Sequence, residues 1–301
     1  MNERHRPRIF TAPPLWDQDS IMAAHLAEVI EVAGRPLDTW QHFALEKGTR
    51  IVPRPAGVFG RSVWSASEVG VLAGRQNGMS VLAEARELGG MYVLGERVVH
   101  TTPTRDAASN AMRRTAHIIK SSPMLDSWVD KMYWTRGEEE IRLRSGGSIR
   151  FRARTERSIE MARAADLLVL DDATDINMYW WINAVACRPD SWYRSARQVW
   201  YLGTAVDRKR HPHGLVFSEI RHRGLSATDP RLCWIEYSAP DTRHDDGALR
   251  IDPTARYRIN QANPSPRVPY EKIQRLHEIL DARVYETDFL GIGDWYAIES
   301  N

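Results

Sequence analysis

Cysteine is scarce in this sequence, and long apolar runs are missing. Cys187 and Cys233 are the two cysteines in 301 residues, and each stands alone in an apolar-periodic stretch. We therefore expect two buried thiols and neither a disulfide framework nor a CxxC metal motif. No run of about 18 apolar residues occurs, which argues against a membrane span. Residues 1–10 are polar and arginine-bearing, unlike the apolar core of a secretory signal. These absences favour a cytoplasmic protein.

A strong net charge of either sign is also missing. The formal net charge is +2, which neither requires nor excludes nucleic acid as a partner. Apolar residues make up 43% of the chain, which is enough for a sizeable core. Tryptophan is abundant instead, with eleven residues. Because Trp180, Trp181, Trp200 and Trp234 fall in strand-like or helical stretches, we expect them to pack in the core rather than to stack on bases.

Strand-like and helix-like segments alternate along the middle of the chain. A hairpin is predicted where residues 140–144 and 148–152 alternate with period two around Ser145-Gly146-Gly147. The continuous apolar strand over residues 166–170 indicates a sheet that is covered on both faces. These patterns predict an α/β fold with a mainly parallel central sheet flanked by helices. The other expected segments are strands over residues 67–73, 98–101 and 198–202, helices over residues 17–32, 79–88, 105–120, 176–187 and 270–282, a helix opening at 36–41 and a loop over 49–62.

Residues 73–80 (AGRQNGMS) follow an apolar strand and open a helix, which is the context of a phosphate-binding loop. In such a loop, backbone N–H groups and the helix N-terminus converge on one spot and favour an anion. Gly78 would let the backbone approach a phosphate closely, and Ser80 would place its hydroxyl on Mg²⁺. Against the pattern GxxxxGK[ST], Ala73 replaces the first glycine and Met79 replaces the lysine. A plain strand–turn–helix junction is the alternative for this segment taken alone.

A second candidate motif is the run LLVLDD at residues 167–172. It has the Walker B pattern, in which Asp171 would hold Mg²⁺ through water and Asp172 would polarise the attacking water. A helix N-cap or a turn is the alternative for an acidic pair after a strand. The two motifs occur in the right order with several α/β elements between them. Together they favour a nucleotide-binding site of the ASCE type of P-loop NTPase.

Several short segments, taken in order, resemble the ATPase half of the large terminase subunit of tailed phages, especially actinobacterial siphophages. The resemblance covers about residues 36–295, and its weight lies in the number and order of the segments. The segments are PLDTWQ at 36–41, GRQNGMS at 74–80, HTTPT at 100–104, LVLDD at 168–172, GTA at 203–205, YSAP at 237–240, QANPS at 261–265 and FLG at 289–291 with Trp295.

The resemblance implies a domain plan and a nucleotide site. An arm and helix (1–35) would precede a P-loop ATPase core (36–262), and a lid or linker (263–301) would lead to an RNase H-like nuclease domain that is either truncated or encoded separately. ATP and Mg²⁺ are the implied cofactors. Ser80 and Asp171 would hold the metal, Asp172 and Thr204 would act in catalysis, and Thr204 would sense the γ-phosphate. The nucleotide would be bound by Gln41, which reads adenine, and by Arg75, Gln76, Asn77, Gly78, Met79 and Ser80.

The implied function is a DNA-packaging ATPase that couples ATP hydrolysis to the translocation of double-stranded DNA into the procapsid. The implied partners are phage DNA, the portal protein, the small terminase subunit, further copies of the chain in a ring, and a separately encoded nuclease domain. We expect no membrane association and a location in the host cytoplasm.

Three positions depart from the family's pattern. Met79 takes the place of the loop lysine, and Asp172 that of the Walker B glutamate. Arg75 is the candidate to replace the lysine in part, because its five donors suit phosphate. The family's trans-acting arginine aligns near 161–162, so Arg163 and Arg157 are the candidates for that role. The alternative interpretation is a degenerate P-loop domain that binds nucleotide, DNA or a partner without efficient hydrolysis.

Arginines are frequent between residues 142 and 157. They are Arg142, Arg144, Arg150, Arg152, Arg154 and Arg157. A basic sheet face that contacts DNA phosphates without sequence preference is one interpretation. A solvated hairpin whose charge is balanced by Glu138, Glu139 and Glu140 is the other.

Overall fold

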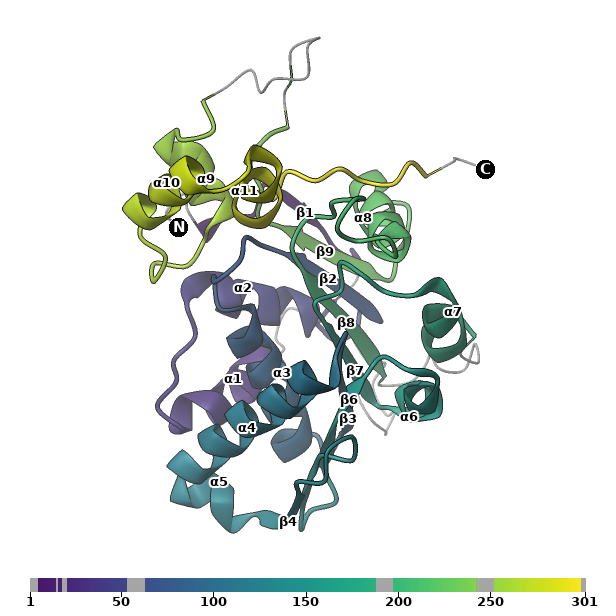
Figure 1. Cartoon of the computed structure of the whole chain (residues 1–301). Helices are drawn as coiled ribbons and strands as arrows, with labels where there is room; N and C mark the ends of the chain where they lie inside the picture. Colours follow the sequence, from purple (N-terminus) through teal and green to yellow (C-terminus); the bar gives the residue numbers. More distant parts are fainter. Residues whose placement is uncertain are drawn as a thin grey trace.

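The computed structural model of the chain describes residues 5–14, 16–17, 21–52, 63–187, 197–241, 243 and 252–298. Within these residues, one sheet of nine strands runs in the order β1-β9-β2-β8-β7-β3-β6-β5-β4 (Figure 1). Neighbouring strands from β9 to β6 are parallel, whereas β1 at one edge and β5 and β4 at the other are antiparallel. The predicted α/β class with a mainly parallel sheet is confirmed. Most of the loop expected over residues 49–62 lies outside the described residues.

The central strands are buried on both faces, which explains their unbroken apolar sequences. In β7, Leu167 and Val169 join the core on one side of the sheet, and Leu168 and Leu170 join the core on the other. Successive side chains of a strand point to opposite faces, so a strand covered twice needs an apolar residue at every position. The strands are β1 (Ile9–Thr11), β2 (Glu68–Leu72), β3 (Arg97–Thr102), β4 (Val129–Tyr133), β5 (Glu140–Leu143), β6 (Ser148–Ala153), β7 (Leu167–Asp171), β8 (Gln198–Gly203) and β9 (Leu232–Glu236).

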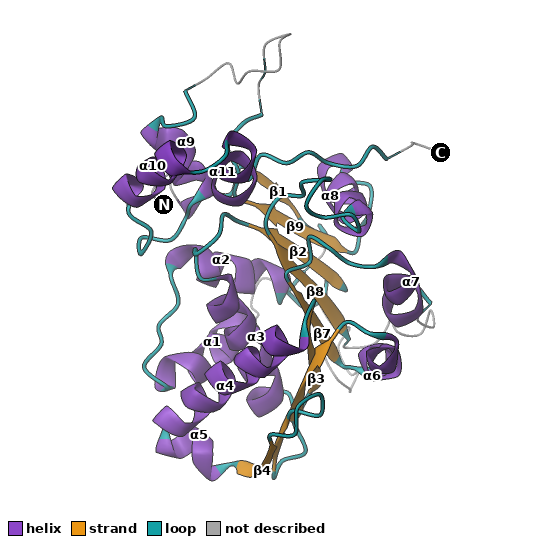
Figure 2. Cartoon of the chain, in the orientation of Figure 1, coloured by secondary structure: helices purple, strands orange, loops and turns teal. Residues whose placement is uncertain are grey.

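Helices cover the two faces of the sheet, as Figure 2 shows. Helices α1 to α5 lie on one face, where α1 packs on α3. The shorter helices α6 and α7 and helix α8 lie on the other face. The bounds are α1 (Met22–Val32), α2 (Thr39–Gly48), α3 (Met79–Val93), α4 (Arg105–Ser121), α5 (Pro123–Ser127), the 3-10 turn η2 (Glu156–Ser158), α6 (Ile159–Ala164), α7 (Met178–Trp181), the π-helix η3 (Ile182–Ala186) and α8 (Leu215–Ser226).

A third, smaller core lies at the carboxyl ends of the parallel strands. It is formed by α9 (Arg256–Ala262), α10 (Tyr270–Ile279) and α11 (Ala282–Phe289), with Ala239 from the segment after β9. Asp281 starts α11 by accepting a hydrogen bond from the backbone N–H of Arg283 at 2.9 Å. The position of this unit matters for function, because it packs over the loop that precedes α3.

A buried ion pair fixes α3 against the sheet. The guanidinium of Arg86 is fully buried and donates two hydrogen bonds to Glu96, at 2.7 and 3.0 Å. Its Nε donates to the side-chain oxygen of Gln198 at 3.2 Å, and the ring of Trp64 lies 5.1 Å away. Every polar partner of this cation is supplied by the fold itself, so the site is structural.

Two sequence-based expectations about the chain need correction or qualification. Cys233 is buried as expected, and burial raises the pKa of its thiol to about 12, but Cys187 is exposed, so the prediction of two buried thiols was wrong. Cys187 follows η3, where the helix expected to run unbroken to residue 187 ends on the surface.

Trp180, Trp200 and Trp234 are buried, as expected for packing residues. None of the described helices has the length and apolar character needed to cross a membrane.

Candidate nucleotide-binding site

The loop between β2 and α3 presents a set of free backbone N–H groups. Gly78 precedes α3 with φ +91°, in the left-handed region that glycine adopts without strain, and Gln76 also has a positive φ of 67°. Among the described residues, the N–H groups of residues 76–80 have no hydrogen-bond acceptor. Five unpaired amides at a helix N-terminus form a concentrated binding site for an anion. The geometry is therefore that of a phosphate-binding loop.

Gln41 supports this loop from below. Its side chain is fully buried, donates from Nε2 to the carbonyl of Gly78 at 2.8 Å and accepts from the N–H of Asp38 at 2.7 Å. Asp38 begins α2 with a capping box in which Gln41 is the reciprocal partner. The capping box fixes the start of α2, and the structure places Gln41 against the phosphate loop.

Asn77 ties the loop to the C-terminal helices. Its buried amide donates to the carbonyl of Gly74 and to the side-chain oxygen of Asn263, each at 2.8 Å, and it accepts from the N–H of Ser265 at 3.1 Å. Asn263 in turn donates to the carbonyl of Phe289 at 2.7 Å. A Cβ at Gly74 would lie 2.8 Å from the Asn263 oxygen, which explains the glycine at this position.

Arg75 points to the same C-terminal unit. Its Nε lies 2.9 Å from a carboxylate oxygen of Asp288, and its N–H donates to the backbone carbonyl of Asp288 at 2.7 Å. Asp288 also pairs with Arg210 at 2.9 Å. The guanidinium of Arg75 is half exposed, so it is accessible, but it is held by a carboxylate. Met79, the first residue of α3, is partly buried and packs on the core beneath the loop.

The acidic pair lies at the same edge of the sheet as the loop. The register pairs Leu72 of β2 with Gly203 of β8, and Leu202 of β8 with Asp171 of β7. Because neighbouring strands lie about 4.8 Å apart, Asp171 is roughly 10 Å from the start of the loop, a span that a nucleotide phosphate and its metal can bridge. Ser80 and Asp171 offer the oxygen donors that Mg²⁺ prefers, with water and phosphate completing its shell. The donor set therefore fits Mg²⁺.

Asp172 and Thr204 complete this edge. Asp172 is exposed, has a positive φ of 54° and accepts a hydrogen bond from the hydroxyl of Thr174 at 2.9 Å. A positive φ is unfavourable for a side chain other than glycine, so the surrounding contacts hold Asp172 in this conformation. Thr204 follows β8, between the loop and Asp171, and its buried hydroxyl has no hydrogen-bond partner among the described residues. A buried unpaired hydroxyl at this position is suited to receive a ligand atom.

Arg154 holds the acidic pair, and sequence reasoning missed this role. Its guanidinium donates to the carbonyl oxygens of Asp171 at 2.8 Å, Asp172 at 2.7 Å and Thr101 at 3.2 Å. Burial lowers the pKa of Arg154 to about 10, against the opposing effect of the aspartates, so it stays charged at neutral pH. Arg154 forms no ion pair with a described carboxylate. It therefore fixes the backbone of both aspartates without pairing with their carboxylates.

His100 is the second residue that the sequence did not reveal. It is buried on β3, with Nδ1 2.6 Å from a carboxylate oxygen of Glu87 on α3 and Nε2 3.7 Å from a carboxylate oxygen of Asp171. Burial alone would lower the pKa of His100, but the charge and hydrogen bond of Glu87 raise it above its ordinary value. A lone histidine in a strand pattern gives no signal of such contacts.

Arg163 lies at the opposite end of the strands. It sits near the end of α6, shortly before β7 begins, where it pairs with Glu160 at 3.3 Å and donates to the carbonyl of Asn183 at 2.9 Å. The phosphate loop and the acidic pair lie at the carboxyl ends, so Arg163 does not reach the site of its own chain. This position is compatible with a role for Arg163 in the nucleotide site of a neighbouring copy, because such a residue does not have to reach the site of its own chain.

Comparison with known proteins establishes the fold. No family model and no curated protein matches the sequence. The large terminase of bacteriophage HK97 has a similar structure, with a TM-score of 0.65 and 14% identity over 89% of this chain and 55% of that one. The large-terminase ATPase domain of Thermus phage P74-26 gives a TM-score of 0.53 and 13% identity over 88% of this chain and 96% of that one. The chain thus spans about half of the first protein and nearly all of the second, and it has the fold of the ATPase domain of phage large terminases.

Proposed function

We propose that this chain is the ATPase motor domain of a phage DNA-packaging terminase, which couples ATP hydrolysis to the translocation of double-stranded DNA. The observation that supports this most is one edge of the sheet on a terminase fold. It carries Ser80, Asp171, and five backbone amides and the Thr204 hydroxyl that have no partner among the described residues. Anion-binding amides, a metal-binding pair and a sensor hydroxyl are the parts that phosphoryl transfer requires.

Each residue of this edge has a role in the proposed reaction. The amides of residues 76–80 bind the β- and γ-phosphates, and Ser80 and Asp171 hold Mg²⁺. The metal, when bound, stabilises the charge that develops on the phosphates. Asp172 orients the attacking water and accepts its proton, and Thr204 contacts the γ-phosphate. Arg154 keeps Asp171 and Asp172 in position.

The same proposal defines the partners. A packaging motor acts on phage DNA in the host cytoplasm, as a ring of identical subunits docked on the portal protein. The small terminase subunit delivers the DNA, and a nuclease domain, in the same protein or encoded separately, cuts it. Arg163 is the candidate arginine for a neighbouring subunit's site, because its position away from its own loop leaves it available for that role. Gln41 is proposed to support the loop; the contact with adenine that the resemblance implies would require its buried side chain to move away from Gly78.

Met79 is the position where this proposal is tested most directly. Substitution Met79→Lys places a cation beside the phosphates, and we expect it to raise kcat about tenfold, since one added charge contact is worth about 1.4 kcal/mol of barrier or more. The measurement is DNA-stimulated phosphate release by wild type and variant. Met79→Gln, which is similar in length and neutral, is the matched control and is expected to stay near the wild-type rate.

The alternative function is a degenerate domain that binds nucleotide without turnover. Two observations favour it: Met79 carries no charge, and the guanidinium of Arg75 is paired with Asp288. If wild type binds nucleotide but releases no phosphate, while Met79→Lys does, the motor proposal fails for this chain and the degenerate domain is the correct assignment.

Arg154 is predicted to act through the two aspartates. Arg154→Lys keeps the charge but replaces the planar guanidinium by an ammonium group, which cannot bond to all three carbonyls in the same geometry. We therefore expect kcat to fall about tenfold while KM for ATP changes less than about twofold. Steady-state phosphate release separates the two parameters. Arg97→Lys, an exposed arginine paired with Asp166 at the other end of the strands, serves as control. An equal loss in both variants, or a change in KM alone, would rule out a positioning role for Arg154.

A further inference from the structure

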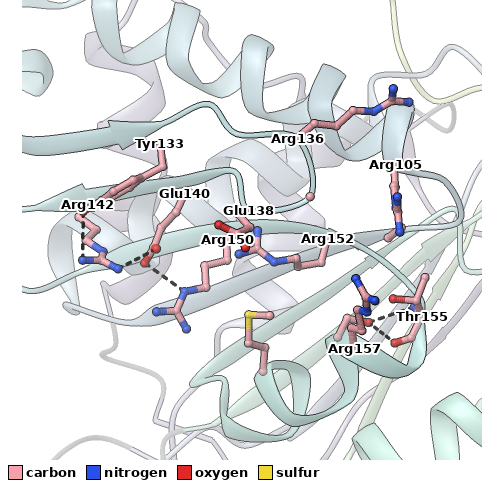
Figure 3. Close-up of a pocket in the computed structure, with 14 residues that line it drawn as sticks. Arg105, Tyr133, Arg136, Glu138, Glu140, Arg142, Arg150, Arg152, Thr155 and Arg157 are labelled. Atoms are coloured by element: carbon pink, nitrogen blue, oxygen red, sulfur yellow. Dashed lines mark hydrogen bonds and ion pairs between the residues drawn. The ribbon is translucent and has the colours of Figure 1, made fainter.

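A cavity of about 480 Å³ lies along strands β4, β5 and β6 and extends past the carboxyl end of β6 (Figure 3). Its walls come from β4, β5, β6, the start of α4 and the turn η2 with α6. Six arginines line it, namely Arg105, Arg136, Arg142, Arg150, Arg152 and Arg157. The proposed nucleotide site does not use this cavity.

Three of the six arginines are paired with carboxylates. Glu140 pairs with Arg142 at 2.9 Å and with Arg150 at 3.0 Å, and Arg136 pairs with Asp106. Burial raises the pKa of Glu140, but the hydrogen bond and charge of Arg142 and those of Arg150 bring it below its usual value, so this carboxylate stays ionised. For these arginines, the interpretation as a balanced hairpin holds.

Among the described residues, the other three arginines are in no ion pair, although Glu138 also lines the cavity. Figure 3 shows Arg105 and Arg157 at the end of the cavity away from Glu140, with Arg152 between them and the Glu140 cluster. Arg152 is only 9% exposed, and its Nε has no hydrogen-bond partner. Burial, followed by repulsion from Arg150, lowers the pKa of Arg152, against the opposing charges of Glu139, Glu140 and Glu138. The guanidinium of Arg152 donates to the carbonyls of Glu139 at 2.8 Å and Phe151 at 2.9 Å, so its Nε is the donor left for a ligand oxygen.

We propose that this cavity binds phosphate groups of the DNA backbone. Arginine forks match phosphate oxygens in charge and in geometry, and the ridge of phosphates along a duplex fits a concave site. Contacts of this kind read no sequence, which suits a translocating motor, and they weaken with salt. The inference rests on the proposed function and deepens it by giving DNA a site on the chain.

The position of the cavity also connects DNA to catalysis. Arg152, Thr155 and Arg157 line it, and Arg154, which lies between them in the sequence, turns the other way onto the carbonyls of Asp171 and Asp172. A phosphate drawn between Arg152 and Arg157 therefore pulls on the segment that positions both aspartates. We therefore expect DNA binding and phosphate release to be coupled through the segment 152–157.

The test uses the full chain and the double variant Arg105→Gln/Arg157→Gln. Binding of a fluorescein-labelled 30-base-pair duplex is followed by anisotropy at several salt concentrations. We expect affinity to fall at least tenfold at low salt and the slope of log K against log salt to become shallower by about 1.8, because each lost phosphate contact removes about 0.9. The control is Arg97→Gln/Arg256→Gln, which removes the same charge from exposed ion pairs elsewhere. Thermal melting confirms that both double variants fold.

Each outcome bears on the proposal separately from the motor function. Loss of DNA affinity with unchanged binding of a fluorescent ATP analogue supports the cavity as the DNA site, even if wild type proves unable to hydrolyse ATP. Unchanged DNA affinity and salt slope, or an equal loss in the control, overturns it. A third outcome also overturns the proposal: the double variant binds DNA normally, but its phosphate release is lower and no longer depends on protein concentration. This result would mean that the arginines act at the nucleotide site of a neighbouring subunit.

Discussion

Replacing Asp171 by asparagine is expected to reduce magnesium-dependent phosphate release about 1,000-fold. Asp171 ends β7 at the same edge of the sheet as the phosphate loop. Arg154 binds its backbone carbonyl rather than its carboxylate, so no described arginine neutralises the charge that would hold the metal. Asparagine keeps the size but removes the charge that holds Mg²⁺, and a loss of about 4 kcal/mol of transition-state stabilisation corresponds to that factor. Phosphate release is measured over a range of Mg²⁺ concentrations.

Asp166→Asn is the matched control for this prediction. Asp166 immediately precedes the same strand but pairs with Arg97 at the amino end, so its replacement is expected to leave phosphate release within about twofold of wild type. Asp171→Asn should keep its affinity for metal-free nucleotide, which the loop amides bind. Retention of more than a tenth of the wild-type rate by Asp171→Asn would remove Asp171 from the metal site.

Replacing Glu96 by glutamine is expected to destabilise the fold by about 3 to 5 kcal/mol, because it leaves the charge of Arg86 buried without a partner. Arg86 is fully buried, and Glu96 accepts two of its hydrogen bonds. Urea unfolding followed by tryptophan fluorescence measures the change in the free energy of unfolding. The pair Arg86→Met/Glu96→Leu should recover much of the loss, since it removes both charges together.

An exposed ion pair provides the contrast. Arg256 and Glu271 lie 3.3 Å apart with about two thirds of each side chain exposed, so Glu271→Gln should cost less than about 1 kcal/mol. If Glu96→Gln costs no more than Glu271→Gln, the cation of Arg86 reaches water in solution and the pair does not hold α3 on the sheet.

The sheet was predictable at most of the strands that are buried on both faces and at the hairpin, although β9, which is also buried on both faces, was missed. The apolar run 167–170 and the alternating run 148–152 appear as β7 and β6, within a residue or two of their expected ends. The edge strand β1 was not predicted, because it is three residues long and is defined by its pairing with β9 rather than by a pattern of its own. Helix α11 was missed for a similar reason: its apolar residues pack against α10 and Ala239, a contact that sequence periodicity does not reveal.

The candidate site was predictable where chemistry lies in short motifs. The loop geometry follows from a strand–loop–helix pattern. The position of Asp171 at the same edge follows from the rule that the carboxyl ends of parallel strands lie at one edge of a sheet. The contacts of Arg154 and His100 did not follow, because each depends on strand order. Arg154 follows β6, and His100 lies on β3, which separates β6 from β7, so only the sheet order β7-β3-β6 shows that both reach Asp171. The partner of Arg75 was also hidden, since Asp288 is more than two hundred residues away in the sequence.

The bonds between the phosphate loop and the C-terminal helices make the two parts a single mechanical linkage. Asn77 is bonded to Asn263, Arg75 to Asp288 and Gln76 to Lys272, so the loop is clamped at three successive residues by the unit above it. A loop that tightens around a phosphate has either to carry α9, α10 and α11 with it or to break these bonds. The stiffness of these three bonds, rather than that of the loop itself, then determines how far α9, α10 and α11 move when a nucleotide binds.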